Sequence, residues 1–158
     1  MSSKPQLSES DRSRLIQAAF DAKKNTYSPY SKFPVGAALL SGDGAIIKGA
    51  NIENASYGGT ICAERTAIVK AASEGIRSFA AIAIVTNIKS PISPCGMCRQ
   101  VLREFCALDM PILLVPADYP QPPSESKGST TEGGVRETTL DELLPDSFGP
   151  EQLELPRH

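Results

Sequence analysis

The sequence predicts an α/β fold, a three-layer α-β-α sandwich in which helices cover both faces of a mixed, mostly five-stranded sheet. Segments with the apolar spacing of helices alternate along the chain with short apolar segments of strand length. Two short segments, 35–40 and 45–52, flank the turn residues of 41–44 and predict a β-hairpin. The later strands are separated by helices, which favours parallel pairs, so both kinds of pairing are expected in one sheet.

The first helix is predicted over residues 8–24. Ser8, with Asp11 three residues later, is typical of an N-terminal cap. The apolar residues that follow recur at helical spacing: Leu15, Ile16, Ala19 and Phe20. A loop with two prolines, 25–34, then leads into the hairpin, and a polar loop with two adjacent glycines, 51–60, follows it.

A second, alanine-rich helix is predicted over residues 62–74. Residues 79–86 (FAAIAIVT) form a candidate strand that is buried on both faces. A loop with two prolines ends at Pro94, where a third helix, 95–106, begins. A further strand is expected at 112–115.

The stretch 118–134 is rich in Pro, Ser, Thr and Gly and is interpreted as a mobile surface loop. A last strand is expected at 135–138. Thr139, with Glu142 three residues later, predicts the cap of a short helix that ends at Pro145.

Length and charge limit the class of protein. The chain has 158 residues, which predicts a single domain over 1–158. Its 16 basic and 18 acidic residues give a net charge of −2, which argues against a nucleic-acid-binding surface. No window has the roughly 18 consecutive apolar residues of a membrane span, and the N-terminal residues lack the apolar stretch of a secretory signal. We therefore expect a cytoplasmic protein whose cysteines are ligands or core residues rather than disulfides.

Three cysteines have the spacing of metal ligands. Cys95 and Cys98 are separated by two residues at a predicted helix start, where free N–H groups and the helix dipole favour thiolates. Cys62 also lies at a predicted helix start. Three thiolates would leave the fourth position of a tetrahedral Zn²⁺ open, which is typical of catalytic zinc. The one histidine is His158, so a Ser-His or Cys-His nucleophilic pair is nearly excluded.

Glu64 and Arg65 follow Cys62 directly along the predicted helix. A carboxylate beside a zinc-activated water can take its proton and later deliver it to a leaving group. Arg65 could hydrogen-bond the thiolates and moderate their negative charge, a charge-tuning role that we state as a hypothesis.

Two structural alternatives remain open for the cysteines. A lone CxxC motif also occurs in redox pairs and in structural zinc half-sites. A structural Cys₄ zinc site would need Cys106, which lies eight residues after Cys98 on the same predicted helix. That spacing is about 12 Å of axial rise, so Cys106 is interpreted as a core thiol.

The sequence resembles the zinc nucleoside and nucleobase deaminases, through the motif CAERTA at 62–67 and SPCGMCRQ at 93–100. More narrowly, it resembles the small homotetrameric cytidine deaminases, through YSPYSKFPVGAAL at 27–39, NIENA at 51–55 and LLPDSFGP at 143–150. The resemblance extends from about residue 7 to residue 153, and the main departure is the stretch 118–134.

The resemblance implies a role for each matched residue. One Zn²⁺ per subunit would be held by Cys62, Cys95 and Cys98, with Glu64 as the catalytic proton carrier. The substrate-binding residues on the same chain would be Phe33 in the base pocket, Asn51 and Glu53 on the ribose 3′-hydroxyl, the adjoining Asn54, and the backbone of Ala63 on the pyrimidine. The residues that would approach a neighbouring subunit's nucleoside in a homotetramer with shared active sites are Ala55, Tyr57 and Phe148.

The implied reaction is the hydrolytic deamination of cytidine and 2′-deoxycytidine to uridine and 2′-deoxyuridine plus ammonia, a step of pyrimidine salvage. A deaminase of polynucleotides has the same chemistry, but the net charge and the absence of Trp speak against it. A deaminase of a cytosine nucleoside antibiotic and a non-enzymatic zinc-stapled binding module remain as alternatives.

Overall fold

The fold is built on one five-stranded sheet with the order β2-β1-β3-β4-β5. The computed structural model describes residues 6–123 and 131–157. The strands are β1 (Gly36–Ser41), β2 (Ile46–Ala50), β3 (Phe79–Val85), β4 (Pro111–Val115) and β5 (Arg136–Thr139). The pair β3–β4 is parallel, and the pairs β1–β2, β1–β3 and β4–β5 are antiparallel. The predicted mixed, five-stranded sheet is therefore confirmed.

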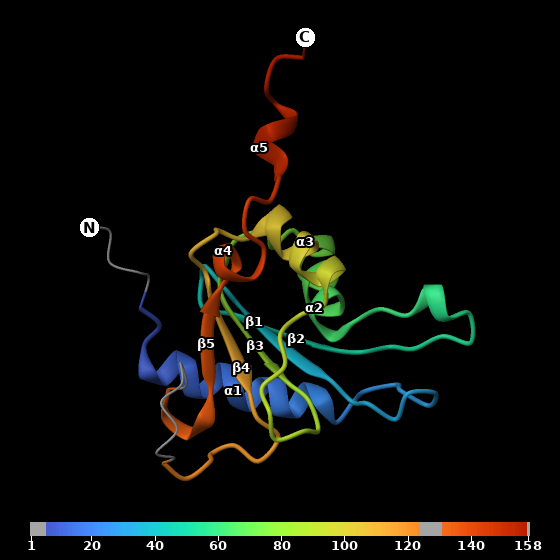
Figure 1. Cartoon of the computed structure of the whole chain (residues 1–158), viewed down its shortest axis with the longest axis vertical. Coiled ribbons are helices and arrows are strands. Elements are labelled where there is room, and N and C mark those ends of the chain that lie inside the picture. The colour runs from blue at the N-terminus through green and yellow to red at the C-terminus, as the bar shows by residue number, and fades with distance from the viewer. Residues whose placement is uncertain (1–5, 124–130, 158) are drawn as a thin grey trace.

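Helices cover both faces of this sheet (Figure 1). On one face lies α1 (Glu9–Lys23), and on the other lie α2 (Ala63–Ser73), α3 (Gly96–Phe105) and the short α4 (Leu140–Leu143). The short α5 (Pro150–Leu153) extends away from the sheet near the C-terminus. Two 3₁₀ turns, at Tyr57–Gly59 and Glu132–Gly134, complete the described elements. The three-layer arrangement is the predicted one.

Alternating side chains along the central strands make two hydrophobic cores. In β1, Ala37 and Leu39 face α2 and α3, whereas Ala38 and Leu40 face α1. Every residue of β1 and of β4 is buried, because helices cover both faces of these strands. This double coverage explains why both segments are continuously apolar in the sequence.

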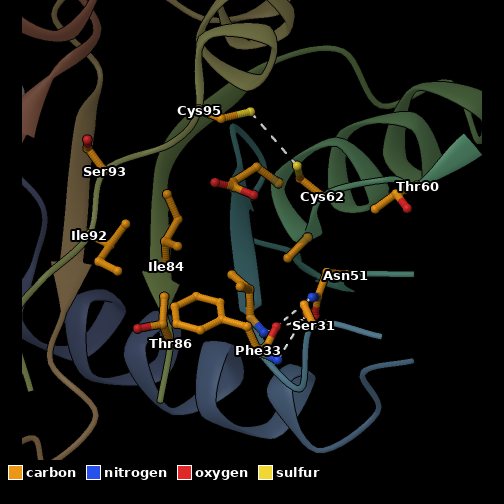
Figure 2. Close-up of a pocket in the computed structure, with 13 residues that line it drawn as sticks. Ser31, Phe33, Asn51, Thr60, Cys62, Ile84, Thr86, Ile92, Ser93 and Cys95 are labelled. Carbon is orange, nitrogen blue, oxygen red and sulfur yellow. Dashed lines mark hydrogen bonds between the residues drawn. The ribbon is translucent and has the colours of Figure 1, made fainter. Parts of the chain in front are cut away.

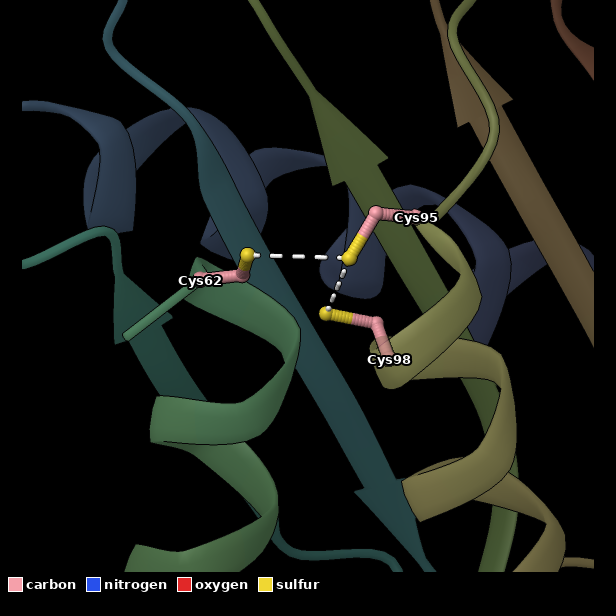
Figure 3. A group of neighbouring side chains, drawn as sticks. All are labelled: Cys62, Cys95 and Cys98. Atoms are coloured by element: carbon pink, nitrogen blue, oxygen red, sulfur yellow. Dashed lines mark hydrogen bonds between the residues drawn. The ribbon is translucent and has the colours of Figure 1, made fainter. Parts of the chain in front are cut away.

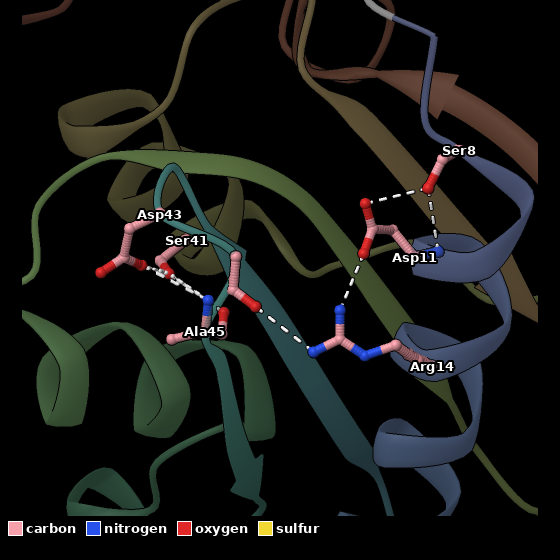
Figure 4. A network of polar contacts seen from close by, with 7 residues as sticks. Ser8, Asp11, Arg14, Ser41, Asp43 and Ala45 are labelled. Atoms are coloured by element: carbon pink, nitrogen blue, oxygen red, sulfur yellow. Dashed lines mark hydrogen bonds and ion pairs between the residues drawn. The ribbon is translucent and has the colours of Figure 1, made fainter.

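The predicted caps stabilise the ends of two helices. The Ser8 hydroxyl accepts a 3.1 Å hydrogen bond from the backbone N–H of Asp11, and Thr139 caps α4 in the same way. Arg14 then joins α1 to the turn between β1 and β2, since it contacts the Asp11 carboxylate at 2.8 Å and the Gly44 carbonyl at 3.3 Å (Figure 4). The first helix is thus fixed to the hairpin that it covers.

The observed elements differ from the prediction at a few boundaries. Cys62 and Cys95 are the N-cap residues of α2 and α3 rather than their first helical residues. The α5 helix is absent from the prediction; its first turn is stabilised by a 2.6 Å hydrogen bond from the Gly149 N–H to the Gln152 side chain. Of the predicted mobile loop 118–134, residues 124–130 lie outside the described part of the chain.

Gly36 sets the distance between α1 and the sheet. A Cβ atom at this position would lie 2.1 Å from the Ala19 carbonyl oxygen and 2.5 Å from the Lys23 nitrogen, both of them backbone atoms. We predict that Gly36→Ala lowers the free energy of unfolding by roughly 1–3 kcal/mol, because the helix has to move off the strand. Gly58→Ala is the matched control, since a Cβ there meets nothing within 4 Å. Chemical denaturation measures both variants, and equal stability of the two would contradict this account of the packing.

Candidate metal centre and active site

The topology brings two helix N-termini to the same edge of the sheet. Strands β2 and β3 both run antiparallel to β1, which lies between them, so they point in the same direction. Each is followed along the chain by a helix, α2 after β2 and α3 after β3. The two helices therefore begin above the same ends of the strands, and their N-cap residues are Cys62 and Cys95.

Three cysteine side chains converge at this point (Figure 3). The Sγ atoms of Cys62 and Cys95 are 3.9 Å apart, and those of Cys95 and Cys98 are 3.5 Å apart. All three Sγ atoms lie within 4.8 Å of one another. With Zn–S bonds of about 2.3 Å, three sulfurs on a tetrahedral Zn²⁺ lie about 3.8 Å apart. The observed spacing thus fits zinc, and it is the only three-residue cluster of this kind among the described residues.

Hydrogen bonds and a nearby cation stabilise the thiolate of Cys62 in the cluster. A hydrogen bond from Cys98, together with the Arg65 guanidinium, lowers the pKa of Cys62 to about 5. That hydrogen bond and burial raise the pKa of Cys98, the donor of the pair. Binding of a metal ion would replace the shared proton, because an ion is held by deprotonated sulfur.

Cys106 is not part of the cluster. It is the C-cap residue of α3, at the opposite end of the helix from Cys95, and it is buried among apolar side chains. Burial raises the pKa of its thiol to about 12, so it stays neutral. The interpretation of Cys106 as a core thiol is confirmed, and the described residues supply no fourth cysteine for a structural Cys₄ site.

Arg65 lies on the first turn of α2 beside the sulfur atoms. Its Nη2 atom is 3.7 Å from the Cys62 Sγ and 3.4 Å from the Thr60 carbonyl oxygen. Its Nε atom is buried and has no partner among the described residues. The hydrogen bond to Cys62 raises the pKa of the guanidinium. A permanent positive charge therefore faces the thiolates, as the charge-tuning hypothesis requires.

Glu64 is buried at the start of α2, with 5% of its surface exposed, and lines a cavity beside the cysteines. Burial raises the pKa of its carboxyl group to about 7. The positive charge of a nearby metal ion would favour the ionised form. A group that can hold or release a proton near neutrality thus lies next to the metal cluster.

The cavity has a volume of about 430 Å³, and Phe33, Ile84 and Ile92 contribute apolar side chains to its wall (Figure 2). This is the first cavity, and its lining residues are Ser31, Phe33, Val35, Asn51, Thr60, Cys62, Ala63, Glu64, Ile84, Thr86, Ile92, Ser93 and Cys95. A second cavity of about 370 Å³ shares Ser31 and Thr60 with it, and its other lining residues are Tyr30, Glu53 and Tyr57. The two cavities adjoin, and the second adds the Glu53 carboxylate and two tyrosine side chains to the apolar space near the cysteines.

Asn51 and Glu53 fix the loop that forms one wall of these cavities. The Asn51 side chain accepts a 2.9 Å hydrogen bond from the Val35 N–H and donates one of 2.8 Å to the Phe33 carbonyl. One oxygen of Glu53 accepts from the N–H groups of Tyr30 and Ser31, at 3.1 and 3.2 Å. Hydrogen bonds, first of all from the Ser31 side chain, lower the pKa of Glu53, so a carboxylate faces the second cavity.

The structure brings most of the predicted site residues together, but not all of them. Phe33, Asn51 and Ala63 line the first cavity, and Glu53 and Tyr57 line the second. Three predicted substrate-binding residues line neither cavity and are exposed, namely Asn54, Ala55 and Phe148. Phe148 lies in the C-terminal segment, where its carbonyl accepts a 3.2 Å hydrogen bond from Gln100 of α3.

Several lining residues are absent from the predicted site, namely Tyr30, Ser31, Val35, Thr60, Ile84, Thr86, Ile92 and Ser93. Ile84 lies near the end of β3 and Thr86 directly follows this strand, which precedes the helix of the CxxC motif along the chain. In α/β sheets, ligands bind beyond the carboxyl ends of the strands. The end of the strand before the CxxC helix is therefore the sequence signal for cavity residues such as Ile84 and Thr86.

A cluster of three thiols at the spacing of zinc ligands, next to a buried acid on a cavity wall, is the donor set of a protein that uses a metal ion to activate water. Residues 9–114 match the family model described as the cytidine and deoxycytidylate deaminase zinc-binding region. The chain belongs to this family of zinc-binding deaminases.

Individual relatives agree with the family model. The cytidine deaminase of Sporosarcina psychrophila is 48% identical over 143 residues, which cover 90% of this chain and 95% of that protein. The cytidine deaminase of Halalkalibacterium halodurans is also 48% identical, over 90% of this chain and 98% of its own. The crystal structure of the cytidine deaminase from Burkholderia pseudomallei has a TM-score of 0.76 and 42% identity, covering 90% of this chain and all of that one. Among the described residues, no helix has the length and apolar character needed to cross a membrane.

We predict that Arg65→Ala weakens zinc retention, because the thiolates lose the cation beside them. Loss of a partner behind the ligands typically costs about 10- to 100-fold in metal affinity. Competition with a colorimetric chelator measures the zinc off-rate. Arg77→Ala, at an exposed arginine on the loop after α2, is the matched control and should release zinc at the wild-type rate. Unchanged zinc release by Arg65→Ala would refute the charge-tuning role.

Proposed function

We propose that this chain catalyses the hydrolytic deamination of cytidine and 2′-deoxycytidine to uridine and 2′-deoxyuridine, with release of ammonia. The observation that carries the proposal is the convergence of three thiols at two helix N-termini beside the buried Glu64, on the wall of a cavity. Membership of the deaminase family and the 48% identity to cytidine deaminases support the same reaction.

The cysteines that would hold Zn²⁺ are Cys62, Cys95 and Cys98. When bound by three thiolates, Zn²⁺ keeps one position for water and lowers the pKa of that water to about 7. Glu64 is the proton carrier: its carboxylate takes a proton from water and passes one proton to N3 of the cytosine. A second proton goes through Glu64 to the 4-amino group, which leaves as ammonia, while the water oxygen stays on C4. Burial raises the pKa of Glu64, so this carboxyl group accepts and holds a proton more readily than an exposed glutamate does.

The remaining cavity residues orient the nucleoside. Phe33 provides an apolar surface for the base, and the backbone of Ala63 hydrogen-bonds the pyrimidine edge. Glu53 accepts the ribose 3′-hydroxyl in the second cavity, where its carboxylate is ionised. Asn51 and the adjoining Asn54 also contact the sugar. Asn51 has one amide N–H available for this contact, because its other side-chain hydrogen-bonding groups are occupied within the protein.

The charge of the site favours nucleosides over nucleotides and polynucleotides. The described residues that line the two cavities include Glu53 and Glu64 but no Lys, Arg or His. A phosphate would find no cationic partner there and would be repelled by the carboxylates. No nucleic-acid partner is therefore proposed. A cytosine nucleoside antibiotic remains a second substrate class for the same chemistry, and a cytoplasmic enzyme of pyrimidine salvage fits the four free cysteines.

We further propose a homotetramer with shared active sites. Phe148 has 60% of its surface exposed and Tyr57 has 76%, although both are large apolar or aromatic side chains. Together with Ala55, they lie where a second copy of the chain can contact them. Exposed aromatic residues of this size favour burial against a partner surface.

The proposal predicts that the ultraviolet absorbance of cytidine falls with wild-type protein and stays constant with Glu64→Ala. The variant removes the proton carrier but no sulfur, so it should retain one zinc per subunit while turnover falls by at least about 100-fold. Glu74→Ala, at the exposed end of the same helix, is the matched control and should stay active. Stripping zinc with a chelator should abolish the wild-type reaction. Full turnover by the zinc-loaded Glu64→Ala protein would remove Glu64 from its role, and a zinc-loaded wild type without turnover would favour a binding module.

Shared active sites predict complementation between two inactive variants. Glu64→Ala and Phe148→Ala subunits, unfolded together and reassembled, should form mixed oligomers in which some sites have both an intact Glu64 and a neighbour's Phe148. Activity should then exceed the sum of the two variants assembled separately. Light scattering gives the mass of the assembly; a monomer, or activity no greater than the sum, would contradict the shared sites.

A further inference from the structure

The loop of residues 26–35 carries Phe33 into the first cavity, and its two ends meet at Asn51. Asn51 directly follows β2 and has only 8% of its surface exposed. In Figure 2 its side chain lies beside Phe33 and Ser31, with dashed hydrogen bonds toward this loop. The buried amide of Asn51 is therefore placed to hold the loop through hydrogen bonds.

The side chain of Asn51 bonds to both ends of the loop. Its Oδ1 atom accepts hydrogen bonds from the Val35 N–H, at 2.9 Å, and from the Thr26 hydroxyl. Its Nδ2 atom donates to the Phe33 carbonyl at 2.8 Å. Both lone pairs of the amide oxygen are thus occupied, and one of two N–H groups is used.

The backbone of Asn51 holds the same loop. Its N–H donates to the Val35 carbonyl at 3.3 Å, and its carbonyl accepts from the Tyr27 N–H at 3.0 Å. The Thr26 hydroxyl also lies 3.1 Å from this carbonyl. Asn51 therefore joins positions 26–27 to positions 33–35, on either side of the turn that contains Tyr30 and Ser31.

Glu53 contacts a different part of the loop from Asn51 and lines a different cavity. It contacts the middle of the loop, at the N–H groups of Tyr30 and Ser31, through the single oxygen Oε1. It lines the second cavity, whereas Asn51 lines the first, together with Phe33 and Glu64. The two residues are thus separable by substitution, although they lie two positions apart.

We propose that Asn51 is a positioning residue for the nucleobase: its side-chain amide fixes the 26–35 loop so that Phe33 faces the base in the first cavity. The inference rests on the proposed deaminase function, and it assigns Asn51 an effect that does not depend on the ribose 3′-hydroxyl. Removing the amide leaves the Val35 N–H and the Phe33 carbonyl without their partner in a part-buried place. The loop then shifts, and Phe33 moves with it.

The test compares two substrates that differ only in the 3′-hydroxyl, 2′-deoxycytidine and 2′,3′-dideoxycytidine. Asn51→Ala should lower kcat/KM on both substrates. The loss on 2′,3′-dideoxycytidine, roughly 100-fold for a displacement of the order of 1 Å, is the part that does not depend on a contact with the 3′-hydroxyl. KM should rise as kcat falls, whereas partial loss of folded protein lowers kcat alone. A loss confined to 2′-deoxycytidine would overturn the proposal, because it would show that Asn51 acts through the hydroxyl.

Glu53→Gln is the matched control. Glutamine keeps an oxygen acceptor for the Tyr30 and Ser31 N–H groups but removes the negative charge that faces the sugar. Its loss should be confined to 2′-deoxycytidine. For each variant, the loss of kcat/KM on 2′,3′-dideoxycytidine reports the positioning of the loop, and any additional loss on 2′-deoxycytidine reports recognition of the hydroxyl. Comparing Asn51→Ala with Glu53→Gln thus separates the two effects.

Thr26→Val keeps the proposal testable if Asn51→Ala does not fold. Thr26 lines neither cavity, yet its hydroxyl donates to Asn51. This variant should show a smaller loss of kcat/KM, equal on both substrates, and unchanged kinetics would count against the proposal.

Hydrogen exchange of the Val35 amide gives a readout without substrate. Exchange should accelerate in Asn51→Ala and in Thr26→Val, and unaltered exchange would refute the role of Asn51. A wild type that deaminates neither nucleoside would overturn the proposed function, while the exchange result would still decide the role of Asn51.

Discussion

The structure depends on the electrostatic match between three cysteine sulfurs and the N-termini of two helices. The strands β2 and β3 point in the same direction, so α2 and α3 begin at one edge of the sheet. Their free N–H groups and the Arg65 guanidinium supply positive charge where Cys62, Cys95 and Cys98 need it as thiolates. Without this positive charge, three thiolates so close together would repel one another.

The packing of the sheet keeps this arrangement rigid. The buried apolar faces of β1 and β4 fix the helices from both sides, and Gly36 lets α1 approach the sheet closely. Side chains of α3 also hold α4 and the segment after it: Arg99 donates to the carbonyl of Leu143, the last residue of α4, and Arg103 donates to the Ser147 hydroxyl. The same helix that presents Cys98 to the ion therefore positions the C-terminal segment with Phe148, so metal centre and proposed interface share one element.

Sequence patterns predicted the features that depend on local periodicity and spacing. The buried strand β1, the caps at Ser8 and Thr139, and the proximity of the three metal-cluster cysteines follow from such patterns. The α5 helix and the cavity positions of Ser31 and Thr60 were not predicted, because they depend on contacts between segments far apart in the chain. Asn51 illustrates the difference: the sequence indicates a polar residue at a strand end, but only tertiary structure shows that its amide is committed to the loop.

The central claim is that three sulfurs hold the ion and leave its fourth position to water. X-ray absorption at the zinc edge of the purified, zinc-loaded protein tests it most directly. The account predicts three sulfur neighbours at about 2.3 Å and one oxygen or nitrogen neighbour at about 2.0–2.2 Å. Four sulfur neighbours, or fewer than three, would contradict the proposed chemistry.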